Sequence, residues 1–309
     1  MNTYSHLADA TRPILDRSVA ERISYIYRDH LIKFDQFNNV TTELQRLLHY
    51  PRQVRMPCML LMGKTGMGKT KAVQAFLRHH GTASASVGGK GIHQQPIVFF
   101  QMPAEPSQGE LFGKLLDALG APISPSTKIR VLERTILNIL RDVGTMLIIV
   151  DEFNILNSST ARQRQIVINA LKNLTNDSCI PIVAVGTLSA QLTIKYDDQM
   201  AHRFRPVVME PFRAGRSLDE FVRTIVAHLP LQSPSDINTA DFKKRLLDLT
   251  GGVTVNLLRL LSDAAVAAIQ SGAERITVAG LSDVPAPLMS IPERRSTSTR
   301  HTSNELNSL

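Results

Sequence analysis

A short glycine-rich stretch carries the clearest chemistry in the sequence. Gly63, Gly66 and Gly68 stand at the spacing of a phosphate-binding P-loop, G-x-x-x-x-G-K-[ST], which Lys69 and Thr70 complete. The glycines let successive backbone N–H groups face one point, and the helix start that follows adds partial positive charge. We expect Lys69 to reach the β- and γ-phosphates of a nucleotide and the Thr70 hydroxyl to ligate Mg²⁺. The residues expected to hold the nucleotide here are Gly63, Thr65, Gly66, Met67, Gly68, Lys69 and Thr70.

The segments on either side of this stretch fit the motif. An apolar run of strand length, Cys58 to Met62, precedes it, and a helix-like segment follows it. A P-loop needs the order strand, glycine loop, helix, so a chance glycine turn is the weaker interpretation. The segment before the strand, residues 50–57, either packs on the nucleotide base or is a plain linker.

Two acids follow a second apolar run. Met146 to Val150 predicts a buried strand, and Asp151 and Glu152 come directly after it. At the carboxyl end of a strand beside the P-loop, Asp151 can enter the Mg²⁺ shell. Glu152 is then placed to orient or deprotonate an attacking water. The alternative is an acidic turn that only caps a core strand.

Two later segments leave their roles open. Thr187 follows a strand-like run at 180–185, and its hydroxyl either bonds the γ-phosphate or the attacking water, or belongs to a plain turn. Arg203 and Arg205 precede a fifth short strand expected at 207–209. They either form a solvated edge or project into the nucleotide of a neighbouring subunit as an arginine finger.

The composition narrows the class of protein. Among 309 residues, 35 are Lys or Arg and 27 are Asp or Glu, which gives a formal charge of +8. A basic surface suggests a polyanion, either nucleic acid or an anionic membrane, although charge for solubility alone is the alternative. Aromatic residues are 5% with no Trp, which argues against a single-strand binder built on stacking.

Targeting and redox features are few. The two cysteines, Cys58 and Cys179, lie in apolar runs, so we expect free core thiols in a reducing compartment. No run reaches the ~18 apolar residues of a membrane-spanning helix. The first residues are polar and do not resemble a signal peptide. We therefore expect a cytoplasmic protein without a membrane partner.

The order of apolar patterns predicts an α/β fold. It indicates a mainly parallel five-stranded sheet followed by a small all-helical lid. We expect four regions: an N-terminal helical extension at 1–50, the α/β core with the P-loop at 51–214, the helical lid at 215–287 and a disordered tail at 288–309. Residues 1–20 are weakly patterned and are expected to be loosely ordered, and Thr41 or Thr42 is expected to cap the second helix.

Taken together, these motifs resemble those of AAA+ ATPases, and most closely the TniB/TnsC/MuB group of transposition regulators, with TniB the nearest. The resemblance extends over roughly residues 20–285. It rests on the P-loop, on Asp151-Glu152, and on the tripeptides Val185-Gly186-Thr187, Arg203-Phe204-Arg205 and Thr250-Gly251-Gly252. The α/β core would then be an AAA+ ATPase domain.

The resemblance implies roles in ATP hydrolysis. Lys69, Thr70, Asp151 and Glu152 would be the Walker residues that hold ATP and Mg²⁺, and Thr187 would be sensor 1. Arg203 or Arg205 would be the arginine finger across a subunit boundary. The position nearest to the sensor 2 arginine of many AAA+ proteins is Asn256, which supplies no charge, and Arg259 stands one turn on. Slow hydrolysis, triggered by a partner or by DNA, would be consistent with this difference.

The resemblance also implies partners. Relatives form ATP-dependent rings or helical filaments on double-stranded DNA and guide a DDE-type transposase. Matching residues predict DNA contacts from Lys114, Thr127, Lys128 and Arg130, to phosphates and therefore sequence-tolerant and salt-sensitive. A solvated helix face is the alternative for each of them. Two other functions share the same ATP site: a helicase loader or protein remodeller, for which Phe112-Gly113 is a weak pore-loop candidate, and a non-oligomeric nucleotide-switch adaptor.

Overall fold

A computed structural model of the chain describes residues 4–28, 30–80, 94–121, 124 and 126–285. The tail expected at 288–309, and most of the glycine-rich segment before the second strand, lie outside these residues. The first part contains η1 (Arg12–Ile14), α1 (Val19–Ile26), α2 (Asp35–Leu48), β1 (Cys58–Gly63), α3 (Lys69–His80), β2 (Ile97–Gln101), α4 (Gln108–Ala118) and α5 (Ile129–Asp142). The middle contains β3 (Leu147–Asp151), η2 (Phe153–Ser158), α6 (Ala161–Ser178), β4 (Ile182–Gly186), α7 (Ala190–Lys195), α8 (Asp198–Arg203) and β5 (Phe204–Met209). The last part contains α9 (Arg216–Ala227), α10 (Ala240–Thr250), α11 (Thr254–Ser271) and α12 (Val278–Asp283).

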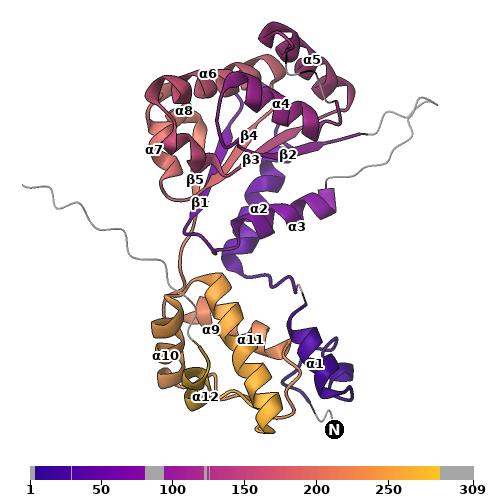
Figure 1. Ribbon diagram of the computed structural model, residues 1–309, viewed down its shortest axis with the longest axis vertical. Coiled ribbons are helices and arrows are strands. Elements are labelled where there is room, and N and C mark those ends of the chain that lie inside the picture. The colour runs from indigo at the N-terminus through magenta and orange to yellow at the C-terminus, as the bar shows by residue number, and fades with distance from the viewer. Residues whose placement is uncertain (1–3, 29, 81–93, 122–123, 125, 286–309) are drawn as a thin grey trace, which may run out of the picture.

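A five-stranded parallel sheet organises the upper lobe of the molecule, as the sequence predicts (Figure 1). The strand order is β2-β3-β4-β1-β5, so the strand that leads into the P-loop lies between β4 and β5. The carboxyl ends of β1, β3 and β4 carry the P-loop, Asp151 and Gly186, and Met62 pairs with Gly186 in register. The sheet therefore brings the phosphate-binding motif, the acids and Thr187 together at the carboxyl ends of its central strands.

Both faces of the sheet are covered by helices. Along β1, Cys58, Leu60 and Met62 pack into the cluster that holds α4, α5 and α6, while Met59 and Leu61 pack into the cluster that holds α2 and α3. The continuous apolar run of the strand follows from this double burial, because successive side chains point to opposite faces. The two layers of helices thus fix the strands whose carboxyl ends carry the site.

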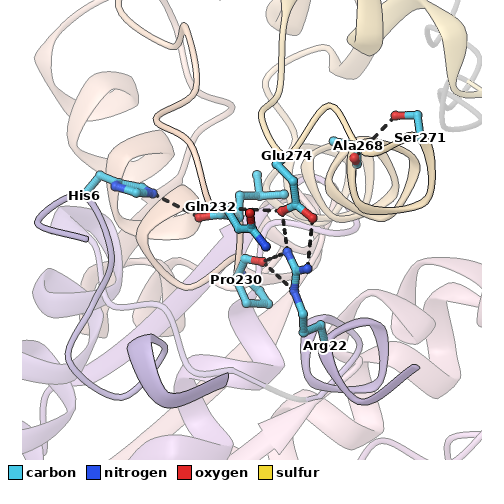
Figure 2. A network of polar contacts seen from close by, with 8 residues as sticks. His6, Arg22, Pro230, Gln232, Ala268, Ser271 and Glu274 are labelled. Carbon is cyan, nitrogen blue, oxygen red and sulfur yellow. Dashed lines mark hydrogen bonds and ion pairs between the residues drawn. The ribbon is translucent and has the colours of Figure 1, made fainter. Parts of the chain in front are cut away.

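The lower lobe is all-helical and includes α1. Helices α9 to α12 share one core cluster with Ile26 and Ile32 of the N-terminal segment. Arg22 of α1 is 3% exposed; it donates two hydrogen bonds to the Pro230 carbonyl and forms an ion pair with Glu274 (Figure 2). The helices expected as one N-terminal extension therefore separate, since α1 packs on the lid and α2 on the sheet. The region boundaries that we expect from the sequence remain predictions.

The expectation that residues 1–20 are loosely ordered is wrong for the described part. Leu7 and Leu15 are buried, and the Ala8 N–H donates to the carbonyl of Ala227 in the lid. His6 also bonds the Leu231 carbonyl (Figure 2). Long-range contacts, which a weak local pattern does not reveal, hold this segment.

Local details differ from the sequence prediction in three places. The Thr41 hydroxyl donates to the Phe37 carbonyl inside α2, so it is not a cap, and α2 begins at Asp35. The short helices α7 and α8 were not predicted. The fifth strand begins at Phe204, so it includes Arg205.

Among the described residues, no single helix is long and apolar enough to cross a membrane; α10 and α11 reach that composition only as a pair bent by 117°.

Candidate functional site

The P-loop joins the end of β1 to the start of α3. Gly66 and Gly68 have φ angles of +82° and +89°, in the left-handed region that favours glycine. The Lys69 ammonium folds back over the loop and donates to the carbonyls of Gly63 and Lys64 at 2.9 and 3.0 Å. Burial lowers the pKa of Lys69, although the nearby carboxylates oppose this shift. A half-buried ammonium at the mouth of a glycine loop is suited to a polyanionic ligand.

A hydroxyl and a carboxylate meet directly beside the loop. The Thr70 Oγ1 donates to Asp151 Oδ2 at 2.8 Å, and Asp151 is 3% exposed. The other oxygen of Asp151 accepts the backbone N–H of Glu152 at 2.8 Å. Hard oxygen donors of this kind, completed by waters and phosphate oxygens, are the ligands that Mg²⁺ prefers. The donor set therefore fits the magnesium site predicted at Thr70 and Asp151.

Glu152 and Thr187 face the same space from neighbouring strand ends. Glu152 has a left-handed backbone, with φ of 55° and ψ of 35°, directly after β3. Thr187 follows β4, and its hydroxyl hydrogen-bonds the Ser189 hydroxyl at 2.8 Å. Asn154, in the turn of η2, contacts both segments and was not singled out from the sequence. No sequence pattern marks Asn154, because its role comes from the contact between η2 and the turn after β4.

One cavity of about 550 Å³ is lined by most of the residues predicted to bind the nucleotide and Mg²⁺. Its polar end is lined by a set that includes Thr65, Gly66, Gly68, Lys69, Thr70, Asp151, Glu152, Asn154 and Thr187. Its other end is mostly apolar and is lined by His30, Leu31, Ile32, Phe34, Phe37, Phe221, Val255 and Leu258. The cavity has the size of a nucleotide site and offers both polar groups for phosphates and apolar groups for a base.

The apolar part of the cavity, where a nucleotide base would fit, is not formed by residues 50–57, which the sequence offered as one possibility. None of residues 50–57 lines the cavity; Met56 is buried and Arg52 reaches the Thr145 carbonyl instead. The segment that connects α1 to α2 takes this place, together with lid residues Val255 and Leu258. Residues 50–57 are thus a structural linker.

Three residues expected at the nucleotide do not line the cavity. The side chain of Met67 is fully buried in the core cluster that holds α2 and α3, and Gly63 contributes its carbonyl to Lys69. Asn256 is buried and donates to the Thr250 carbonyl at 3.2 Å. Asn256 thus lies outside the cavity, and the first turn of α11 places Val255, not Asn256, at the P-loop, so the contact of Asn256 with a nucleotide stays a prediction.

The two arginines lie outside the cavity of their own chain. Arg203, at the end of α8, donates to the Asn176 side chain at 2.7 Å. Arg205, on the edge strand β5, pairs with Glu43 at 3.1 Å, and its side chain is 63% exposed. Neither arrangement tests a role in a neighbouring subunit.

The residues predicted to touch DNA lie on the two helices at one side of the sheet. Lys128 is the N-cap of α5, and Lys128 and Arg130 are exposed while Thr127 is half-buried. Lys114 lies on the exposed face of α4, which packs against α5. Phe112, the candidate for a pore loop, is 1% exposed inside α4 and cannot act as one.

Comparison with known proteins supplies the wider context. A family model described as Bacterial TniB protein matches residues 22–214. No curated protein matches the chain. Among solved structures, the chain is similar to Aeropyrum pernix ORC1 in complex with DNA, with a TM-score of 0.56 and 14% identity over 84% of this chain and 67% of that one.

Two further structures show the same likeness. Aeropyrum pernix ORC2 in its ADPNP-ADP complexes has a TM-score of 0.53 and 13% identity over 83% of this chain and 69% of that one. Drosophila ORC bound to DNA has a TM-score of 0.52 and 14% identity over 89% and 66%. At such identities the likeness shows the fold alone.

These ORC proteins share the AAA+ arrangement of a parallel sheet and a helical lid that the present structure contains. The family match covers more than half of the chain, including the P-loop, the acid pair and both arginines. The protein belongs to the TniB family and has the fold of an AAA+ ATPase.

Proposed function

We propose that this protein is an ATP-dependent DNA-binding regulator of transposition, which oligomerises on target DNA and recruits or activates a DDE-type transposase. The observation that carries the proposal is the meeting of Lys69, Thr70, Asp151, Glu152 and Thr187 in one cavity of a TniB-family chain. The residues supply each group that phosphoryl transfer to water requires.

Each side chain has a proposed task in hydrolysis. Lys69 binds the β- and γ-phosphates. Thr70 and Asp151 would hold Mg²⁺, which would supply positive charge for the phosphate oxygens. Glu152 orients a water and accepts its proton as the water oxygen bonds to the γ-phosphorus. The bond from that phosphorus to the β–γ bridging oxygen breaks, and ADP leaves with the electron pair. Thr187 bonds the γ-phosphate or the water.

The arginines support assembly of subunits. The Arg205–Glu43 pair is solvent-exposed on the arginine side, and exposed pairs contribute only about 0–1 kcal/mol. An arginine held so weakly can exchange its partner for a γ-phosphate of a neighbouring chain. ATP at the boundary then stabilises the oligomer, and hydrolysis removes the contact.

Basic residues on α4 and α5 supply the proposed DNA surface. Lys114, Lys128 and Arg130 are exposed, and Thr127 begins the same turn as Lys128. Contacts from such side chains to phosphates give binding that tolerates any sequence and weakens steeply with salt. The likeness to two ORC structures that hold DNA supports this part of the proposal through the fold only.

Electron microscopy with double-stranded DNA tests the assembly. We expect rings or filaments with ATP and with a non-hydrolysable analogue, and none with ADP or without nucleotide. The Lys69→Ala variant should lose them under all conditions because it loses the nucleotide. Equal DNA affinity with and without ATP would contradict the proposal.

Steady-state ATPase measurements test the arginines. Loss of an arginine finger lowers kcat by about 10³-fold or more. We expect this for Arg203→Ala or Arg205→Ala, with ATP affinity of the isolated chain unchanged. Full activity in both variants would favour a nucleotide-switch adaptor that does not oligomerise.

A further inference from the structure

Asn154 joins the two catalytic segments at the polar end of the cavity. Its Nδ2 donates to Glu152 Oε2 at 3.2 Å, and its Oδ1 accepts the backbone N–H of Thr187 at 3.1 Å. A backbone N–H only donates, so the amide oxygen must face Thr187 and the amide nitrogen must face the carboxylate. The orientation of Asn154 is therefore fixed by its two neighbours.

The close approach of Asn154 to β4 depends on Gly186. A Cβ at Gly186 would lie 3.0 Å from Asn154 Oδ1 and 3.2 Å from the Asn154 backbone nitrogen. It would also lie 3.0 Å from the Cβ of Ala190. Contacts this short are tighter than ordinary van der Waals packing, so η2 could not approach the strand end to the same distance. The absence of a side chain at Gly186 thus allows Asn154 to come close enough to bond the Thr187 N–H.

The backbone of Glu152 needs support from its surroundings. A non-glycine residue in the left-handed region is strained and persists only where neighbouring contacts hold it there. The Glu152 N–H donates to Asp151 Oδ1, and the Glu152 carbonyl accepts the N–H of Ile155 at 3.0 Å. These bonds fix the backbone of Glu152 but not its carboxylate. Among the described residues, the side chain that donates a hydrogen bond to this carboxylate is Asn154.

A second asparagine of η2 bonds the same turn without touching Glu152. Asn157 Nδ2 donates to the Ser189 hydroxyl at 2.9 Å, and its Oδ1 accepts the Thr193 hydroxyl at 2.6 Å. The Ser189 hydroxyl in turn bonds Thr187. Asn157 and Asn154 therefore both connect η2 to the turn after β4, and only Asn154 reaches the carboxylate.

We propose that Asn154 is a positioning residue for ATP hydrolysis: it holds one oxygen of Glu152 so that the other faces the attacking water, and it links this oxygen to the Thr187 backbone. The inference rests on the proposed ATPase function. A displacement of Thr187 by the γ-phosphate would then reach Glu152 through a single side chain. Misplacement of a catalytic group by even 1 Å lowers rates strongly, so such a link has a measurable effect.

Two substitutions separate the two bonds of Asn154. Asn154→Asp keeps the shape and the acceptor for Thr187 but replaces the donor to Glu152 with a like charge. Asn154→Ala removes both bonds. We expect kcat to fall about 10- to 100-fold in both variants. The affinity for ATP should change less than kcat, because Lys69, Thr70 and Asp151 are kept in both variants.

Hydrogen exchange without nucleotide gives a readout that is independent of activity. The Thr187 amide should stay protected in Asn154→Asp and exchange faster in Asn154→Ala, since only the second variant loses its acceptor. Asn157→Ala is the matched control from the same turn. It should cost stability without separating kcat from ATP affinity as the Asn154 variants do.

The outcomes separate this inference from the proposed function. Wild-type turnover together with an unchanged kcat in Asn154→Asp overturns the role of Asn154 alone. Unchanged exchange of the Thr187 amide in Asn154→Ala overturns the link to β4. A wild-type protein that binds ATP without turnover, alone and with DNA, rejects the ATPase proposal and the role of Asn154 with it.

Discussion

Val255, in the first turn of lid helix α11, donates its backbone N–H to the carbonyl of Gly66 in the P-loop at 2.9 Å. The lid therefore contacts the phosphate-binding loop through the main chain. The Val255 side chain also lines the cavity. Where Asn256 supplies no charge, this bond offers another route by which the position of the lid and the conformation of the P-loop depend on each other.

Gly66→Ala should separate the lid from the P-loop. The added methyl group would lie 2.5 Å from Val255 Cγ1 and 3.1 Å from Val253 Cγ1, on a backbone with φ of +82°. We expect ATP affinity to fall about tenfold or more, from backbone strain and the displaced lid. Titration with a fluorescent ATP analogue measures the affinity, and hydrogen exchange of the Val255 amide measures the lid contact.

Gly68→Ala is the matched control for this variant. Gly68 has a similar φ of +89°, but a Cβ there would meet no atom within 4 Å. It should weaken ATP binding through strain while leaving the Val255 amide protected. Combining Gly66→Ala with Val255→Ala should restore part of the lid contact, since the clashing methyl groups are removed. Full protection of Val255 in Gly66→Ala alone would show that the lid does not depend on this glycine.

The parts of the site that sequence predicts are those whose chemistry requires a fixed local order. The P-loop spacing and an acid directly after an apolar strand identify Lys69, Thr70, Asp151 and Glu152, because parallel strands bring their carboxyl ends to one edge. The five strands can be predicted because strands buried on both faces are short, continuous apolar runs in the sequence. Local order also explains why Thr187 could be named but not assigned: a hydroxyl after a strand fits a plain turn equally well.

The parts that sequence does not predict depend on contacts between distant segments. His30 and Phe34 reach the base end of the cavity only because α1 packs on the lid and α2 on the sheet. Asn154 has no local pattern that distinguishes it from any turn residue. Helices α7 and α8 have six residues each, too few for a helical period to stand out.

Arg22→Ala should loosen α1 from the lid. Arg22 is 3% exposed, and its loss leaves the Pro230 carbonyl without its side-chain donor and the Glu274 carboxylate with only the backbone N–H of Gln232 (Figure 2). Removing one member of a buried ion pair costs about 3–5 kcal/mol, and the partly exposed Glu274 places this case near the lower value. Thermal unfolding should report a lower Tm, and hydrogen exchange should show the loss of protection in α1.

Arg17→Ala is the control from the same segment. The Arg17–Glu21 pair is 3.7 Å long, with side chains 63% and 56% exposed. Solvent and salt screen exposed pairs of this kind, so Tm and exchange should change little. Equal effects of the two substitutions would mean that α1 is held by apolar packing, through residues such as Ile26, and not by the buried ion pair.

Cys58 should be chemically silent in the folded protein. Burial raises the pKa of its thiol to about 11, so the reactive thiolate is scarce at neutral pH. Cys179 is half-buried and should react first with a thiol reagent. In the Cys179→Ser variant, we expect no reaction with Ellman's reagent until urea unfolds the chain. Equal rates of reaction before and after unfolding would contradict the burial of the Cys58 side chain between β1 and the helices that cover it.

The protonation of Lys69 should control how ATP affinity varies with pH. Burial lowers the pKa of Lys69 in the free protein, while Asp151 and Glu152 oppose the shift. The charged ammonium binds phosphate, so affinity is full below the lowered pKa and falls as the pH rises through it, beginning below the ordinary value of 10.5. Binding in that range should take up protons, which calorimetry in buffers of different ionisation enthalpy detects. Lys69→Arg should remove the fall in affinity, because the guanidinium keeps its charge. An identical fall in this variant would assign the pH dependence to another group.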